Sequence, residues 1–138
     1  MLIYSIKEDG VVMKIIYMSV IGNTRRFVEK LEMDSLELSE VNAFSEIDEN
    51  FIMIAPTYAI EMTDILNDFL ETGDNLSYCQ GVIGAGNRNF NELYCFTAED
   101  IALDYDVPLL YRFEFQGSDN DVKKVKEIVT EIENTNYV

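Results

Sequence analysis

Three short polar segments of this 138-residue chain combine residue types that could hold a phosphorylated aromatic ligand. The first, residues 19–24, reads Ser-Val-Ile-Gly-Asn-Thr and joins an apolar run to a helical pattern. Hydroxyls, an amide and a glycine at a helix N-terminus aim backbone N–H groups and the positive helix end at one point, which suits a phosphate. The alternative is an ordinary helix cap by Asn23 or Thr24. The segment has no lysine, so it is not a Walker A loop.

The second and third segments offer aromatic rings and glycines. Residues 56–62 follow an apolar run and place Tyr58 where a ring could stack on a planar ligand or simply close the core. Residues 84–90 read Gly-Ala-Gly-Asn-Arg-Asn-Phe. Their glycines would let the backbone approach a flat ligand, or form a tight turn with a helix cap. Asn89 stands where a dinucleotide fingerprint needs its third glycine, which argues against that motif.

Composition excludes several other chemistries. Ten Lys and Arg against 26 Asp and Glu give a formal net charge of −16, which argues against nucleic acid and anionic membrane as partners. The absence of histidine excludes Ser-His-Asp and Cys-His catalysis and every histidine-ligated metal. Arg25, Arg26 and Arg88 lie in or beside two of the three segments, where they would offset charge near an anionic ligand.

The acidic residues are unevenly spread. Residues 31–87 contain no Lys or Arg, which favours a solubilising face or, alternatively, steering towards a basic partner. Cys79 and Cys95 have no metal-ligand spacing, so we expect no metal and two reduced thiols. With no signal sequence and no apolar run long enough to span a bilayer, a cytoplasmic location is expected.

The elements that position these segments follow from hydrophobic periodicity. Continuous apolar runs at residues 14–18, 51–55, 81–84 and 108–113 predict strands buried on both faces, and 35–38 predicts a weaker one. Helical spacing covers residues 24–31, 64–72, 91–105 and 122–132, the last with a capping box from Ser118 and Asp121. This alternation predicts an α/β domain of the doubly wound type, with ligands beyond the carboxyl ends of the strands.

We expect this domain to span residues 13–138. Residues 1–12 precede the first core strand and are expected to be an N-terminal extension, which could reflect an upstream start codon before Met13. The alternative is a short additional strand through residues 2–4.

Three stretches of the chain resemble known protein families. Residues 19–24 are similar to the phosphate loop of flavodoxins, S/T-x-T-G-N-T, with Ile21 in place of a hydroxyl residue. Residues 81–90, Gly-Val-Ile-Gly-Ala-Gly-Asn-Arg-Asn-Phe, resemble the G-V-x-x-S-G-N-R-N-F/W stretch of the NrdI family. Residues 107–117 and the following Asp121-Val122 resemble its V-P-x-L-x-x-F-E-L-x-G-x-x-x-D-V segment. The resemblance runs in the same order from Met13 to about Ile132.

This resemblance implies a flavodoxin-like three-layer sandwich, with a five-stranded parallel sheet of order 2-1-3-4-5 and helices on both faces. It implies that FMN phosphate binds residues 19–24 and that the flavin ring lies between the second and third segments. The implied cofactor-binding residues are Ser19, Val20, Ile21, Gly22, Asn23, Thr24, Thr57, Tyr58, Ala59, Gly86, Asn87, Arg88, Asn89, Phe90 and Tyr94. No side chain is expected to act as acid, base or nucleophile, because the flavin supplies the chemistry.

The resemblance also implies partners. NrdI proteins serve class Ib ribonucleotide reductase: oxidant made from reduced flavin and oxygen reaches the small, radical-bearing subunit, and a reductase re-reduces the flavin. Two alternatives remain at this point. One is a general acidic flavodoxin that carries electrons. The other is a flavin-free partner-binding module, because residues 58–62 contain the carboxylate of Glu61 where many family members are glycine-rich.

Overall fold

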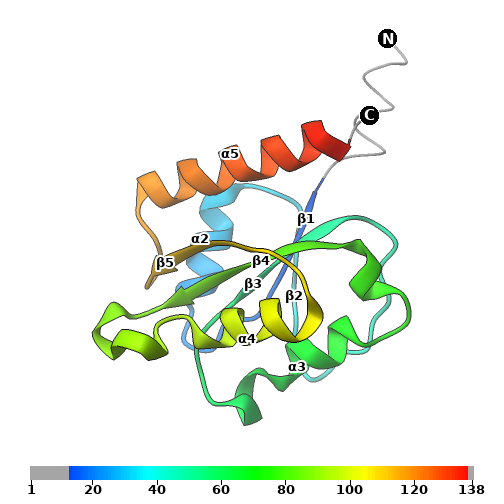
Figure 1. Ribbon diagram of the computed structural model, residues 1–138, viewed down its shortest axis with the longest axis horizontal. Helices are drawn as coiled ribbons and strands as arrows, with labels where there is room; N and C mark the ends of the chain where they lie inside the picture. The colour runs from blue at the N-terminus through cyan, green and yellow to red at the C-terminus, as the bar shows by residue number, and fades with distance from the viewer. Residues whose placement is uncertain (1–12, 137–138) are drawn as a thin grey trace.

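The structure is a computed structural model that describes residues 13–136, and Figure 1 shows a central sheet between two helical layers. The strands are β1 (Lys14–Tyr17), β2 (Ser35–Glu37), β3 (Phe51–Ala55), β4 (Cys79–Gly86) and β5 (Leu109–Glu114). The helices are α2 (Asn23–Leu31), α3 (Ile60–Leu70), α4 (Phe96–Tyr105) and α5 (Asp119–Asn136), with 3₁₀ segments η1 (Asn75–Tyr78) and η2 (Arg88–Leu93). All strand pairs are parallel and their order is β2-β1-β3-β4-β5, which confirms the predicted topology.

The two faces of the sheet are covered by different helices. α2 and α5 pack together on one face, and α3 and α4 on the other (Figure 1). Along β3 the side chains alternate: Ile52 and Ile54 join the cluster under α2 and α5, whereas Phe51 and Met53 join the cluster under α3 and α4. All of β3 is fully buried, as expected for a central strand of a doubly covered sheet.

The strand register brings the predicted segments together. Tyr17 pairs with Ile54, and Ala55 pairs with Gly84 in the next strand. Gly86 pairs in turn with Glu114, so β1, β3, β4 and β5 end at the same edge of the sheet. The loops that leave these strand ends therefore lie beside one another, at the edge where open parallel sheets bind ligands.

Some element boundaries differ from those predicted. The helix expected over residues 91–105 is divided, because η2 ends at Leu93 and α4 begins only at Phe96. Within η2, Asn91 adopts φ 54° and ψ −117°, which no helix accommodates. The second helix begins at Ile60, four residues earlier than predicted, and ends at Leu70. The fourth strand is longer than residues 81–84.

The capping box predicted before the last helix is present. The Ser118 N–H donates to Asp121 Oδ2 at 2.8 Å, and the Asp121 N–H donates to Ser118 Oγ at 3.1 Å. The expectation for residues 1–12, an extension or an extra strand, lies outside the described residues.

Candidate functional site

The first loop turns sharply between β1 and α2. Gly22 caps the helix at φ 99°, a left-handed conformation that favours glycine. The cap residue, Gly22, has no side chain that could accept a hydrogen bond, and the cap predicted for Asn23 or Thr24 is not formed. Instead Ser19 Oγ accepts the Arg25 N–H at 3.2 Å. The first N–H groups of a helix lack intrahelical acceptors, so this loop presents donors to whatever lies beyond the sheet edge.

The second loop, residues 56–59, is bonded to its neighbours on the adjacent strand and helix. Thr57 Oγ1 donates to the Ala85 carbonyl at 2.6 Å, which ties the loop to β4. Thr97 Oγ1 donates to the Tyr58 carbonyl at 3.3 Å, which ties it to α4. α3 begins immediately afterwards, with Ala59 as its cap and Glu61 exposed in its first turn.

The third loop leaves β4 through a crowded glycine. A Cβ on Gly86 would lie 3.1 Å from both the Cys95 nitrogen and Thr57 Oγ1, so a larger residue would push the second and third loops apart. Asn87 then caps η2 by accepting the Asn89 N–H at 2.9 Å, as the helix-cap alternative predicted. Phe90, which follows, is 60% exposed.

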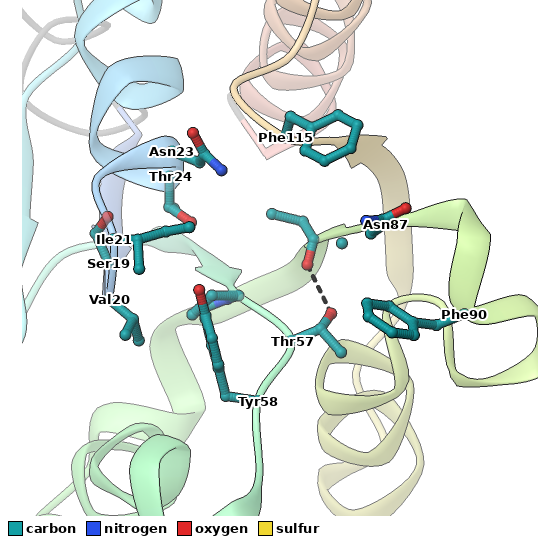
Figure 2. A pocket seen from close by; sticks show the side chains of 13 residues that line it. Ser19, Val20, Ile21, Asn23, Thr24, Thr57, Tyr58, Asn87, Phe90 and Phe115 are labelled. Carbon is teal, nitrogen blue, oxygen red and sulfur yellow. Dashed lines mark hydrogen bonds between the residues drawn. The ribbon is translucent and has the colours of Figure 1, made fainter.

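These three loops surround one cleft with a cavity volume of about 200 Å³. Figure 2 shows its two ends: the hydroxyl and amide groups of the first loop lie on one side, and the rings of Phe90 and Phe115 on the other. Tyr58 lies between them, near Val20. The lining residues are Ser19, Val20, Ile21, Asn23, Thr24, Pro56, Thr57, Tyr58, Ala85, Gly86, Asn87, Phe90 and Phe115.

Ten of the residues predicted from the sequence line this cleft, and five do not: Gly22, Ala59, Arg88, Asn89 and Tyr94. Gly22 and Ala59 set the starts of α2 and α3. The Arg88 N–H donates to Glu114 Oε2 at 3.0 Å and its guanidinium pairs with Glu114 at 3.6 Å, so Arg88 fastens the third loop to β5.

Tyr94 lies behind the third loop. Its ring is buried, with the guanidinium carbons of Arg88 and Arg112 each 5.3 Å from its centroid. Its hydroxyl is buried without a hydrogen-bond partner among the described residues, and burial raises the pKa of Tyr94. Two cation–π contacts hold it as a support for η2.

Three lining residues were not among the predicted cofactor-binding residues: Pro56 and Ala85, which lie within the second and third segments, and Phe115, which lies outside all three. Phe115 follows β5 in a left-handed conformation, φ 54°, with its N–H donating to the Gly86 carbonyl at 3.1 Å. Positive φ is strained for a bulky residue, and 51% of this one is exposed at the mouth of the cleft. The usable signal was its position directly after a strand whose end lies at the ligand edge.

Ion pairing and burial shift the pKa values of three groups near the first and third loops. Hydrogen bonds from Arg25 lower the pKa of Glu37, and burial together with Glu37 raises the pKa of Tyr17 to about 12. Burial raises the pKa of the Cys95 thiol to about 11, so this free thiol remains protonated at neutral pH.

Comparison with known proteins agrees with the geometry. The profile of the family described as "NrdI Flavodoxin like" matches residues 15–127. The chain is 40% identical over 120 residues to Protein NrdI of Beutenbergia cavernae, covering 80% of this chain and 86% of that protein. It is 34% identical over 134 residues to Protein NrdI of Mesoplasma florum, covering 91% of this chain and 89% of that protein.

The chain belongs to the NrdI flavodoxin-like family. This confirms the family resemblance, and with it FMN as the expected cofactor and ribonucleotide reductase as the system that the family serves. Among solved structures, oxidised Flavodoxin 2 from Bacillus cereus matches with a TM-score of 0.66 at 18% identity, covering 90% of this chain and 99% of that one. That likeness confirms the flavodoxin fold.

The cleft fits FMN in its chemistry. The donor-rich first loop suits a phosphate, Gly86 lets the second and third loops pack closely at the wall of the cleft, and the rings of Tyr58 and Phe90 suit a planar flavin. Residues 13–136 contain no cluster of three side chains able to hold a metal ion. No helix within that range is long and apolar enough to cross a membrane.

Proposed function

We propose that this protein binds FMN in the three-loop cleft and delivers oxidant to the small subunit of a class Ib-type ribonucleotide reductase. The observation that carries the proposal is the convergence of the Gly-Asn-Arg-Asn-Phe loop with the helix-capping first loop on one cleft, within an NrdI family chain. Residues 19–24 would hold the phosphate, and the second and third loops would hold the ring.

When bound, the flavin would supply the electrons that reduce oxygen; the chain's own residues orient it and shield it. Tyr58 and Phe90 would flank the ring, and Thr57 fixes the spacing of the loops through its bond to Ala85. Phe115 closes the cleft on the β5 side (Figure 2). A cytoplasmic location, where reductase subunits and flavin reductases are available, belongs to the same proposal.

A general acidic flavodoxin that carries electrons between other proteins is the second candidate, favoured by the net charge of −16. Such flavodoxins carry a longer and more acidic third loop. The third loop here is short and amide-rich, and its only described carboxylate contact is the one from Arg88 to Glu114.

The experiment mixes the purified, FMN-loaded and reduced protein with the metal-loaded small subunit of a class Ib reductase, adds oxygen and records the tyrosyl-radical signal by electron paramagnetic resonance. We expect a stable complex and oxygen-dependent radical formation above the level of free reduced FMN. A flavin-loaded protein that neither binds the subunit nor raises the radical yield, yet reduces unrelated acceptors, would support the general flavodoxin instead.

A further inference from the structure

Two adjacent arginines at the start of α2 have different partners. Arg25 forms a bidentate pair with Glu37, with Nε to Oε1 at 2.9 Å and Nη2 to Oε2 at 2.6 Å. Arg26 folds back over the first loop, where its Nη1 donates to Asn23 Oδ1 at 3.2 Å. Within residues 13–136, no carboxylate lies within 4.0 Å of the Arg26 guanidinium, whereas Glu37 neutralises Arg25.

The position of Arg26 relates it to the cleft. Its guanidinium lies 3.3 Å from the point where a Cβ on Gly22 would stand, against the residue that caps α2. Asn23, to which it donates, lines the cleft beside Thr24 (Figure 2). Arg26 therefore adds a full positive charge to the partial charge that the helix N-terminus already provides at this end.

The other arginines near the cleft cannot provide this charge. Arg88 is paired with Glu114, and Arg112 with Glu99 at 3.1 Å, both on the side of the third loop. A phosphate ester carries about −1.5 to −2 charges at pH 7, and it must approach a chain whose formal charge is −16. Long-range repulsion would favour an uncharged ligand unless a local cation offsets it.

We infer that Arg26 is the specificity-determining residue that makes the cleft prefer phosphorylated FMN to uncharged riboflavin. The inference rests on the proposed function, because it assigns a residue to the phosphate end of the same cleft. Arg26 does not line the cleft. It acts through its positive charge and through its hydrogen bond to Asn23, and it touches no reacting atom.

The test measures dissociation constants for FMN and riboflavin with wild type, Arg26→Gln and Arg26→Lys. At low ionic strength we expect Arg26→Gln to weaken FMN binding about fivefold and riboflavin binding less than twofold, as for loss of one nearby exposed charge. Arg26→Lys keeps the charge and should retain most of the selectivity. Lys124→Gln makes the same change in net charge on α5, where Lys124 contacts Glu127, and should leave the FMN-to-riboflavin ratio unchanged.

Salt dependence in wild type gives a second readout that needs no variant. If Arg26 dominates, added salt weakens FMN binding; if global acidity dominates, salt screens repulsion and strengthens it. In the Arg26→Gln variant, added salt should instead strengthen FMN binding. Equal FMN-to-riboflavin ratios in Arg26→Gln and Lys124→Gln, or wild-type FMN binding that tightens with salt, would overturn the assignment of Arg26 while leaving the proposed function intact. A wild-type protein that binds neither flavin would overturn both.

Discussion

At the scale of single residues, the Glu37 carboxylate connects three elements. It accepts two hydrogen bonds from Arg25 on α2 and one from the Tyr17 hydroxyl on β1, at 3.0 Å, while belonging to the short edge strand β2. β2 has only three residues and pairs with one neighbouring strand, so few backbone bonds hold it in place. The hydrogen bonds of Glu37 therefore fix β2 relative to the first loop, which Arg25 follows.

This network predicts a pH dependence. The pKa of Glu37 is lowered in the folded state, chiefly by Arg25, so its ionised form contributes stability above its unfolded pKa of about 4.3 that is lost as pH falls through the folded value. The difference in melting temperature between wild type and Arg25→Gln should therefore be fully present above about pH 5 and shrink as pH falls towards 3. Thermal melts across this range measure it.

Lys124→Gln is the matched control, because Lys124 and Glu127 are both exposed on α5 and 3.9 Å apart. Its melting temperature should follow that of wild type at every pH. A difference for Arg25→Gln that stays constant between pH 3 and 7 would show that Arg25 acts by packing rather than through the Glu37 charge.

The site shows what residue types alone can and cannot predict. The first loop was predictable because Ser-x-x-Gly-Asn-Thr after a buried strand has a direct physical meaning at a helix N-terminus. Tyr94 is among the predicted cofactor-binding residues, yet it does not line the cleft, and its buried ring contacts the guanidinium groups of Arg88 and Arg112. The direction of a side chain depends on the backbone of η2, which the sequence pattern does not reveal.

At the scale of elements, the third loop is held by contacts on its far side. Asn91 and Cys95 both have positive φ and bracket a turn that sends Tyr94 into the interior. Two guanidinium groups then cover the buried ring. The buried tyrosine hydroxyl makes no hydrogen bond among the described residues, and the nearby Arg88 only partly offsets the rise in the Tyr94 pKa that burial causes.

Tyr94→Phe should therefore leave stability unchanged or raise it slightly, by up to about 1 kcal/mol, because an unsatisfied buried hydroxyl is removed and the ring is kept. FMN affinity should also stay within about twofold of wild type, since Tyr94 does not line the cleft. Urea denaturation and flavin titration measure the two quantities.

Tyr94→Leu is the companion variant: it removes the ring that the two guanidinium groups contact and should destabilise the protein by about 1–3 kcal/mol. A Tyr94→Phe protein that loses more than about 1 kcal/mol would contradict this account, because the hydroxyl would then have a binding partner.

Element boundaries were less predictable than element types. The five strands followed from continuous apolar runs alternating with helical spacing, whereas their order was implied by the family resemblance. The division of residues 91–105 did not, because the apolar spacing continues through a kink that depends on Asn91 and on the packing of Tyr94. The early start of α3 at Ile60 places Glu61 in its first turn, where a carboxylate stabilises the helix end, and this explains a negative charge in a loop expected to favour glycine.

At the scale of the whole molecule, charge and fold act together. Residues 31–87 contain no Lys or Arg, and this acidic stretch includes β3, the second loop and α3 on one side of the cleft. Arg25 and Arg26 lie at the start of α2, beside the first loop; Glu37 neutralises Arg25, so Arg26 provides the net positive charge there. The molecule thus presents a cationic end for a phosphate within a surface that repels anions elsewhere, which favours one orientation of a phosphorylated ligand.

The central claim is that this cleft holds FMN, and anaerobic titration of the purified protein with FMN tests it most directly. We expect one FMN bound per chain with a dissociation constant below about 1 μM, flavin fluorescence that is quenched by electron transfer from the Tyr58 ring, and bound flavin that is bleached by reductant and restored by oxygen. A protein that leaves FMN fluorescence unchanged at about 100 μM flavin, while still folded by circular dichroism, would contradict it and favour a flavin-free partner-binding module.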